Sequence, residues 1–302
     1  MQNLIPISDS RYPKLLKELG KDAPKQLYYK GKWPFDTAQG KDDIFENCLA
    51  VVGSRRMTSY GRQITEKLVS ELASRGITIV SGFMYGIDAQ AHKAALEAGA
   101  RTIAVMPCGI DLIHPDYQKD LYQEILENKG LVISEYEGNF LPTLWTYPRR
   151  NRLVAGLSKA VMVVEAGEKS GSLITANFAK KYKRKVFVVP GPLTSSLSVG
   201  ICQLIKEGAE VVTGAGDVLD FFGTKAAERS VENCSLPLSS GREQFSANSI
   251  EQKIIQKLQQ ESMEIDALSR MLGISAAEIG TVVSLMQIRG LVFNENGKFY
   301  VH

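Results

Sequence analysis

The chain has 302 residues and a formal net charge of +3, from 36 lysines and arginines against 33 acidic residues. Its composition, 44% hydrophobic and 23% charged, is typical of a globular protein, and its length allows two domains. It contains no apolar run of bilayer length and no signal-peptide pattern at its start, so we expect a cytoplasmic protein without a membrane segment. The four cysteines form no CxxC pair and lie at no metal-ligand spacing, which favours free thiols over disulfides or a zinc site.

Residues 1–46 predict a short helix at Tyr12–Leu19 and an extended segment around Gln26–Tyr29. Six short β-branched runs then alternate with helix-period segments: Leu49–Val52, Thr78–Val80, Thr102–Met106, Leu131–Ile133, Val161–Val164 and Val186–Val189. Unbroken apolar runs are typical of parallel strands that helices cover on both faces. The order therefore predicts an α/β fold with a Rossmann-like, doubly wound, mostly parallel sheet.

The helices that follow the first two strands carry recognisable end signals. Thr58 or Ser59 can cap the first helix and Gly76 can close it, while the second runs from about Asp88, a possible cap, to Ala98. A last helix is expected near Asp217–Phe222. We expect residues 1–223 to form the Rossmann-like domain with a short N-terminal extension, residues 224–248 to be a Ser- and Glu-rich linker, and residues 249–302 to form a small winged-helix domain.

Each predicted strand is followed by a loop rich in glycine or small polar residues. These loops contain Gly53–Arg56, Ser81–Phe83, Pro107–Gly109, Glu165–Thr175 and Pro190–Pro192. Because the carboxyl ends of parallel strands meet at one edge of a sheet, the loops should gather where such folds bind ligands. That edge is the predicted site.

One stretch, from Trp145 to Lys185, concentrates positive charge. It holds ten lysines and arginines and only two acidic residues, a net +8 in a chain whose total is +3. Such a region predicts a partner that bears many phosphates.

Three segments at the predicted edge are suited to phosphate or base contacts. Gly171, Ser172 and Thr175 open a helix, whose amides and hydroxyls can bind phosphate, although Ser170 or Ser172 could simply cap that helix. Gly53, Ser54, Arg55 and Arg56 occupy the first strand's loop, where an arginine can bind phosphate through two hydrogen bonds or remain a solvated charge.

The third segment surrounds Pro148, which we expect at the first position of a helix. It places Arg149, Arg150 and Arg152 in a first turn that favours anions, and we assign one of them to a core carboxylate such as Glu165 and at least one to a ligand. Tyr147 offers a flat surface for stacking a base, or else a core side chain.

Several enzyme classes lack their signatures. There is no GxxxxGK[ST] loop and no GxGxxG after the first strand, which disfavours a P-loop ATPase and a dinucleotide enzyme. We expect no cofactor and no metal. A phosphoribohydrolase-like nucleotide hydrolase remains the alternative, but it needs a carboxylate near the ribose, and no acidic residue occurs between Glu168 and Glu207. Glu165, Glu135 or Asp88 would then have to supply it.

Taken together, the motifs resemble those of the DNA-processing protein A family (DprA, also called Smf). The matching segments occur in family order over about Ile7 to Phe222, and they are Gly53–Arg55, Ser81–Gly82, Gly86–Asp88, Ala91–His92, Thr102–Val105, Gly109–Asp111, Ser134–Glu135, Tyr147–Pro148, Arg150–Arg152, Ser170–Leu173, Thr175–Ala176 and Pro190–Gly191. The terminal domain resembles the winged helix of many members, and we expect no counterpart of the helical amino-terminal domain that some members carry.

The resemblance implies a cytoplasmic, non-enzymatic homodimer that binds single-stranded DNA without sequence preference, protects it and loads RecA recombinase onto it during natural transformation. It assigns the phosphate-contacting arginine to Arg55 and the base-stacking aromatic residue to Tyr147. The full predicted DNA-binding set is Gly53, Ser54, Arg55, Arg56, Tyr147, Arg149, Arg150, Asn151, Arg152, Lys169, Gly171, Ser172 and Thr175.

The chain departs from the family pattern at two places where members carry lysine. His114-Pro115-Asp116 replaces a common Tyr-Pro-Lys, and Leu144 replaces a lysine upstream of the stacking aromatic residue. Arg149, Lys169 or the cluster Lys180–Lys185 could supply the missing charge. The segment 249–302 carries a net charge of −1, which favours protein contact over duplex binding and disfavours a further alternative, a transcription regulator.

Overall fold

The computed structural model describes residues 3–34, 44–224, 250–258, 263–288, 292–295 and 298–300. It contains two compact units, Met1–Arg229 and Ser230–His302. None of the helices in these ranges combines the length and the apolar character that crossing a bilayer requires. Three cysteines within these ranges form no disulfide: Cys48 and Cys108 are buried, and Cys202 is half-buried.

A nine-stranded sheet forms the centre of the first unit, in the order β1-β2-β6-β5-β4-β3-β7-β8-β9. Its strands are β1 (Leu4–Pro6), β2 (Gln26–Gly31), β3 (Cys48–Val52), β4 (Thr78–Ser81), β5 (Thr102–Gly109), β6 (Leu131–Tyr136), β7 (Ala160–Val163), β8 (Lys185–Val188) and β9 (Glu210–Val211). Strands β3 to β9 pair in parallel, and the chain winds outward from β3 in both directions. The predicted doubly wound α/β sheet is confirmed.

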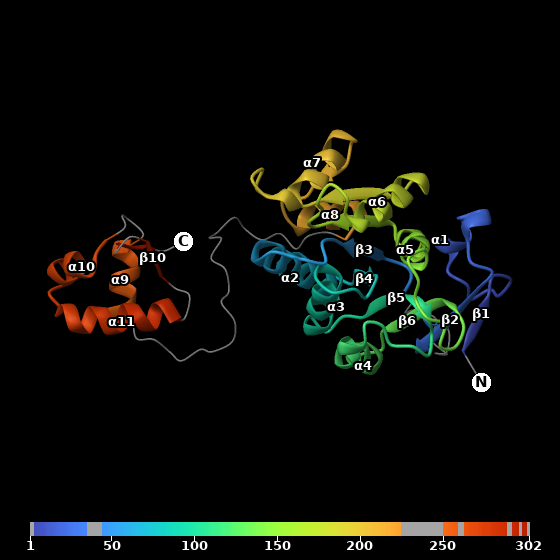
Figure 1. The fold of residues 1–302 in the computed structure, drawn as a ribbon, viewed down its shortest axis with the longest axis horizontal. Coiled ribbons are helices and arrows are strands. Elements are labelled where there is room, and N and C mark those ends of the chain that lie inside the picture. The colour runs from blue at the N-terminus through green and yellow to red at the C-terminus, as the bar shows by residue number, and fades with distance from the viewer. Residues whose placement is uncertain are drawn as a thin grey trace. The chain divides into compact units, whose positions relative to one another are not determined.

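Helices cover both faces of this sheet. They are α1 (Lys14–Lys17), α2 (Ser59–Ser74), α3 (Ile87–Glu97), α4 (Lys119–Glu127), α5 (Thr146–Gly156), α6 (Gly171–Lys181), α7 (Val199–Lys206) and α8 (Ala215–Phe222). In Figure 1, α6 and α7 lie above the sheet while α2, α3 and α4 lie below it.

The strand residues alternate between two apolar cores, as the two-residue period of a strand requires. Leu49 and Val51 of β3 pack in the core with α2, α3 and α8, whereas Cys48, Ala50 and Val52 pack in the core with α5, α6 and α7. Both sets are buried. This two-sided burial explains why the strands read as continuous apolar runs.

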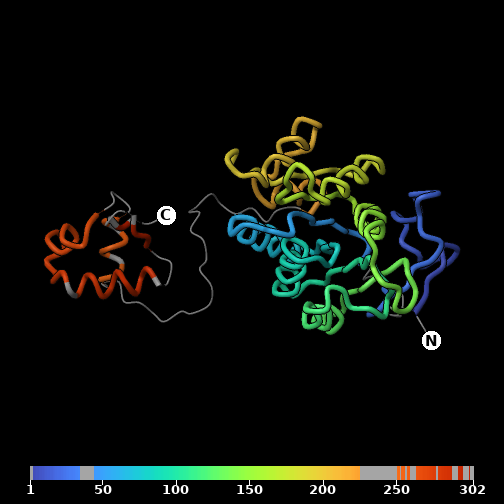
Figure 2. Tube along the Cα trace, viewed as in Figure 1, coloured from blue at the N-terminus to red at the C-terminus, as the bar shows by residue number. Residues whose placement is uncertain are grey.

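The N-terminal segment adds two antiparallel strands to the sheet. Tyr29 of β2 pairs with Ile133 of β6, and β1 pairs with β2 at the outer edge. Figure 2 shows this blue segment beside the green trace of the chain that includes β6. The sequence predicted an extended segment here but gave no partner, because the two paired strands lie about a hundred residues apart.

Two helix starts can be compared with the prediction. Thr58 caps α2 as expected, its side chain accepting from the Gly61 amide, and Gly76 ends the helix in the left-handed region. Asp88, however, is not the cap of α3: the helix begins one residue earlier, after Gly86, and the Asp88 carboxylate instead accepts a hydrogen bond from the Met84 amide.

The second unit contains three helices, α9 (Ile250–Leu258), α10 (Ile265–Leu272) and α11 (Ala276–Ile288), and the antiparallel pair β10 (Phe293–Glu295) and β11 (Lys298–Tyr300). Met263 adds an isolated bridge to Phe299, and both side chains belong to the unit's own apolar core. This order of elements is the one expected for a winged helix, which stays a prediction. Most of the predicted linker, residues 225–248, lies outside the described residues.

A buried arginine joins α5 to the loop after β4 and to the middle of β5. The Arg150 guanidinium is 3% exposed and donates to the carbonyl oxygens of Gly82 and Val105, the latter at 2.6 Å. Burial lowers the Arg150 pKa to about 10, against the opposing effect of the nearby Asp88 carboxylate, so the side chain is charged at neutral pH. Burial in turn raises the pKa of Asp88.

A buried histidine on α3 is held in its neutral form. The Thr102 hydroxyl donates its single proton to the Ile79 carbonyl, so it must accept from Nδ1 of His92 at 2.7 Å. Nε2 of His92 is buried without a hydrogen-bond partner among the described residues. Burial therefore lowers the pKa of His92 to about 3, because a second proton would create an unpaired charge in the core.

Arg150→Met should lower the free energy of unfolding by about 3 kcal/mol or more, since it leaves two buried carbonyl groups without their donor and removes the positive charge that acts on the buried Asp88. Urea denaturation measures this change. Arg55→Ala is the matched comparison, because Arg55 is exposed and its removal should change stability by less than about 0.5 kcal/mol. Equal effects of the two changes would contradict a structural role for Arg150.

His92 should make the fold sensitive to acid. Between a pKa of about 6.5 in the unfolded chain and about 3 in the folded protein, the unfolded state binds more protons, so stability falls as the pH falls through this window. Relative to His92→Asn, the wild type should lose about 2 kcal/mol of unfolding free energy between pH 7 and pH 5. Urea titrations of both proteins in the same buffers test this. Parallel pH dependences would show that His92 is not the responsible group.

Candidate functional site

A cavity of about 760 Å³ opens at the carboxyl ends of the parallel strands, where β3 and β7 lie side by side. The chain winds in opposite directions from these two strands, so their loops diverge and leave space for a ligand. The lining comes from the loops after β3, β4 and β7 and from α5 and α6. The predicted edge of the sheet is thus the edge that carries this cavity.

The structure brings most of the predicted residues together. Eleven of the thirteen line the cavity: Gly53, Ser54, Arg55, Arg56, Tyr147, Arg150, Asn151, Lys169, Gly171, Ser172 and Thr175. Arg149 and Arg152 do not. The Arg150 guanidinium, although it borders the cavity, is already committed to backbone carbonyl groups.

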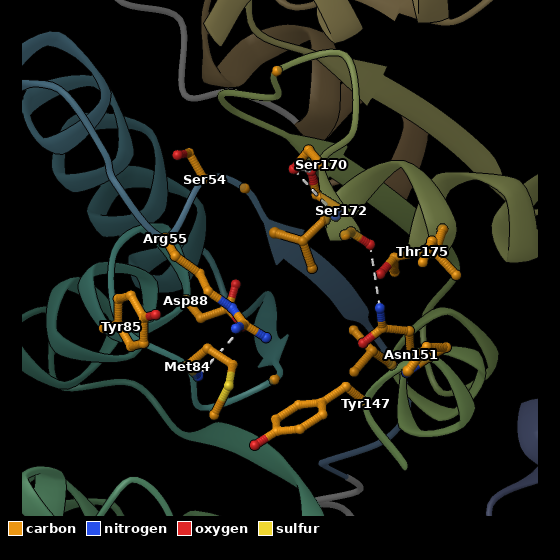
Figure 3. A pocket seen from close by; sticks show the side chains of 18 of the residues that line it. Ser54, Arg55, Met84, Tyr85, Asp88, Tyr147, Asn151, Ser170, Ser172 and Thr175 are labelled. Atoms are coloured by element: carbon orange, nitrogen blue, oxygen red, sulfur yellow. Dashed lines mark hydrogen bonds between the residues drawn. The ribbon is translucent and has the colours of Figure 1, made fainter. Parts of the chain in front are cut away.

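The charge of Arg55 is available to a ligand in the cavity. This side chain is exposed, and no carboxylate among the described residues lies within ion-pair distance of its guanidinium. Its Cζ atom lies 5.3 Å from the ring centre of Tyr147 and 5.7 Å from that of Tyr85 (Figure 3). Cation-π attraction therefore positions the charge without neutralising it.

The backbone around Arg55 is tightly constrained. The Ser54 hydroxyl accepts from the Arg56 amide at 3.0 Å, and the Ser54 carbonyl accepts from the Ile87 amide at 3.2 Å. Gly86, in a positive-φ conformation, packs so closely that a Cβ there would collide with the carbonyl of Ser54. These contacts fix the direction in which Arg55 leaves the loop.

Tyr147 is the second residue of α5, and its ring is half-buried. A hydrogen bond of 2.8 Å joins its hydroxyl to Nε2 of His114. Desolvation lowers the pKa of His114 against the opposing effect of the Asp116 carboxylate, and the nearby arginine charges lower it further, so the imidazole is neutral at pH 7. The Tyr147 ring is therefore anchored at its hydroxyl end and exposes part of its face.

The N-terminus of α6 forms the opposite wall. Ser170 caps the helix by accepting from the Ser172 amide, so the capping role expected for Ser170 or Ser172 falls to Ser170. Nδ2 of Asn151 donates to the Gly171 carbonyl at 3.3 Å, as Figure 3 shows, which ties α5 to α6. The positive end of the α6 dipole faces the cavity.

The two glycines of the predicted set differ in what requires them. A Cβ at Gly53 would lie 2.6 Å from the Ile87 side chain, so packing alone demands glycine at that position. A Cβ at Gly171 would meet no atom within 4 Å, and its φ is not positive. The fold therefore tolerates a side chain at Gly171, and only a ligand in the cavity would need it to be absent.

Helix α5 begins earlier than predicted, which changes the roles of its arginines. The helix starts at Thr146, so Pro148 is its third residue, where the missing amide proton costs no intrahelical bond. Arg149 and Arg152 both pair with Glu135, at 3.1 Å and 2.5 Å. The carboxylate partner is thus Glu135 rather than Glu165, whose own oxygens accept from Thr58.

Beyond α5, several cations of the positive stretch lie near the two ends of α6. Lys169 is exposed and lines the cavity at the N-terminal end. At the C-terminal end, four cations pair with carboxylates: Lys180 with Glu207, Lys181 with Asp22, Arg184 with Glu18 and Lys185 with Glu210. Of the three candidates for replacing the charge of the family lysines, Lys169 lines the cavity. Arg149 and the Lys180–Lys185 cluster do not.

Sequence reasoning missed several lining residues, among them Met84, Tyr85, Ile174 and Leu197. Tyr85 lies in the loop after β4, at the correct edge of the sheet, and an aromatic residue in such a loop was the available signal. Asp88, which the sequence suggested as a helix cap and as a substitute acid but not as a DNA contact, is the carboxylate among the described lining residues.

Comparison with known proteins gives the site a context. The profile of the family "DNA recombination-mediator protein A" matches residues 3–223. Protein Smf from a Synechocystis strain is 40% identical over 215 residues, which is 71% of this chain and 52% of the relative. DNA processing protein DprA from Streptococcus pneumoniae is 42% identical over 216 residues, 72% of this chain and 73% of the relative. The chain thus spans about half of the length of the Smf relative.

Two solved structures are similar as well. The X-ray structure of S. pneumoniae DprA aligns with a TM-score of 0.66 at 40% identity and covers 72% of this chain and 74% of that chain. DprA from Helicobacter pylori, whose structure is described for its single-stranded DNA binding mode, aligns with a TM-score of 0.62 at 34% identity over 74% of this chain and 98% of that chain. The extent of the profile match and these relatives show that the chain belongs to the DNA recombination-mediator protein A (DprA/Smf) family.

Proposed function

We propose that the Rossmann-like unit binds single-stranded DNA without sequence preference in the cavity between β3 and β7. The observation that carries this proposal is the exposed Arg55 guanidinium, which lies between two aromatic rings and has no described carboxylate partner. The similarity to the H. pylori protein, described for its binding of single-stranded DNA, supports the same ligand class.

The cavity offers contacts suited to phosphates. Arg55 and Lys169 supply positive charge, and the N-terminus of α6 supplies a dipole and backbone amides. The volume of about 760 Å³ lies in the range of pockets that enclose a ligand of nucleotide size. Phosphate contacts give affinity but carry no sequence information.

Tyr147 supplies the base contact. Every base has a flat face, so stacking on an aromatic ring tolerates any sequence. The hydrogen bond to His114 holds the ring in place before DNA arrives, which reduces the entropy lost on binding. Binding without sequence preference follows from this combination.

The carboxylates near the cavity support a binding role over catalysis. Cleaving an N-glycosidic bond requires a carboxylate positioned at the ribose. Glu165 is engaged by Thr58 and Glu135 by two arginines, and neither lines the cavity. Asp88 does line it but is 8% exposed and accepts from the Met84 amide. We propose that the protein is not an enzyme, so incubation with nucleoside monophosphates should release no free base.

The cellular role rests on the family. We propose that the protein acts in the cytoplasm as a homodimer, protects incoming single strands during DNA uptake and loads RecA recombinase onto them. The family description, a recombination mediator, supports this assignment. The residues 249–302 carry a net charge of −1, so we propose that this unit, a winged helix, contacts protein rather than duplex DNA.

Arg55→Ala should weaken binding to an unstructured oligonucleotide about 10- to 100-fold, because it removes a charged hydrogen-bonding group from a phosphate. The slope of log affinity against log salt should also become shallower by about 0.7 for each phosphate that the variant no longer neutralises. Fluorescence anisotropy at several salt concentrations measures both. Lys67→Ala, which removes one exposed charge from α2 outside the cavity lining, is the control and should leave both values unchanged. Similar weakening in the two variants would indicate general electrostatics rather than this site.

Gly171→Val should leave the fold intact but reduce DNA affinity at least tenfold, since the added side chain would occupy the space that a phosphate needs at the α6 terminus. Gly216→Val is the matched control: Gly216 lies in the first turn of α8, also has open space around its Cβ position, and is not part of the cavity lining. Thermal unfolding and anisotropy of both variants test the claim. Unchanged DNA affinity of Gly171→Val would exclude the α6 terminus from the site.

A further inference from the structure

Arg55 has a second aromatic neighbour that the proposed base contact does not use. Tyr85, from the loop between β4 and α3, places its ring centre 5.7 Å from the Arg55 guanidinium, nearly as close as Tyr147 at 5.3 Å. Figure 3 shows Arg55 between the two rings. Tyr85 is 43% exposed and lines the cavity.

The fold fixes the loop around Tyr85 without using its side chain. Phe83 is fully buried, and its carbonyl accepts from Gln118 at 3.0 Å. The Met84 amide donates to Asp88, and Gly86 packs against the carbonyl of Ser54. Tyr85 is therefore presented at a defined place by its neighbours on both sides.

The Tyr85 side chain itself makes few contacts that stabilise the fold. Among the described residues, its hydroxyl has no hydrogen-bond partner and its ring packs against no other aromatic ring, whereas the Tyr147 hydroxyl is bonded to His114. An exposed aromatic ring held beside a cation at the mouth of a cavity has the character of a stacking surface.

The covalent structure of a nucleic acid indicates which ligand two such rings could bind. Each phosphate links two nucleosides, so a phosphate on Arg55 has one base on its 5′ side and one on its 3′ side. Two rings on different sides of the guanidinium are placed to receive these two bases separately. A free mononucleotide could engage only one of them.

We propose that Tyr85 stacks a second base, so that Tyr147, Arg55 and Tyr85 together hold one dinucleotide step as base, phosphate and base. This inference rests on the proposed function, in which Arg55 takes the phosphate and Tyr147 the first base. The smallest ligand that fills the site is then a dinucleotide. Removal of one stacked base should weaken binding about 5- to 140-fold.

The test uses the full chain and thymidine dinucleotides that compete with a labelled oligonucleotide. The probes are TpT and its two abasic versions, which lack the base on the 5′ or the 3′ side. The wild type should bind TpT more tightly than either abasic probe. Tyr85→Ala should weaken TpT binding and lose the preference for TpT over one abasic probe, while it keeps the preference over the other. Tyr147→Ala should keep the preference that Tyr85→Ala loses, and lose the one that it keeps. Tyr85→Phe should behave as the wild type, because the ring is retained.

A matched control and two outcomes decide the proposal. Tyr117→Ala removes a more exposed tyrosine near Arg55 that does not line the cavity, and it should change nothing. If Tyr85→Ala leaves TpT binding unchanged, or weakens all three probes equally, then Tyr85 binds no base and at most orients Arg55. Arg55→Ala in the same assay distinguishes failure of this inference from failure of the proposed function. If Arg55→Ala loses TpT binding and Tyr85→Ala has no effect, only this inference is overturned. If Arg55→Ala binds TpT fully, the proposed function is overturned.

Discussion

A short chain of hydrogen bonds from Arg150 holds the walls of the cavity in register. The buried guanidinium donates to carbonyl groups of Gly82 and Val105, its Nε donates to the Asn151 side chain, and Asn151 donates to Gly171 at the start of α6. The first turns of α5, which also carry Tyr147, therefore cannot shift without breaking bonds to the loop after β4, to β5 and to the start of α6. The Tyr147 ring and the N-terminal end of α6 are positioned by this one network.

The network also explains how the protein uses its positive charge. Arginine suits buried sites because its planar group can satisfy several acceptors at once, and Arg150 does so in the core. Arg149 and Arg152 satisfy a single carboxylate, Glu135, whose own charge they offset. Arg55, by contrast, extends from a constrained loop and meets ring faces instead of carboxylates, so it retains a charge for a ligand at the cavity. Available charge, rather than total charge, determines where a phosphate can bind.

The carboxylates at and near the cavity, unlike Arg55, are engaged by partners within the protein. Glu135 offsets the charges of two α5 arginines, and Glu165 fixes the start of α2 through Thr58. Asp88 accepts from Met84 and lies next to the charge of Arg150. Each of these three carboxylates is thus already engaged within the protein.

The sequence by itself determined the α/β class, the positions of the parallel strands, the edge of the sheet that carries the cavity and about half of the residues that line it, because apolar runs and glycine-rich loops are local signals. The family resemblance singled out Arg55, but the residue pattern alone could not show that Arg150 and Arg152 are engaged elsewhere. Their partners, such as Val105 and Glu135, come close to them only in the folded protein. For the same reason the residue pattern gave β2 no partner and overlooked Tyr85, whose closeness to Arg55 arises only when two loops meet at the sheet edge. Tertiary structure decided these points because hydrogen bonds, ion pairs and ring contacts form between neighbours in space, whatever their separation in sequence.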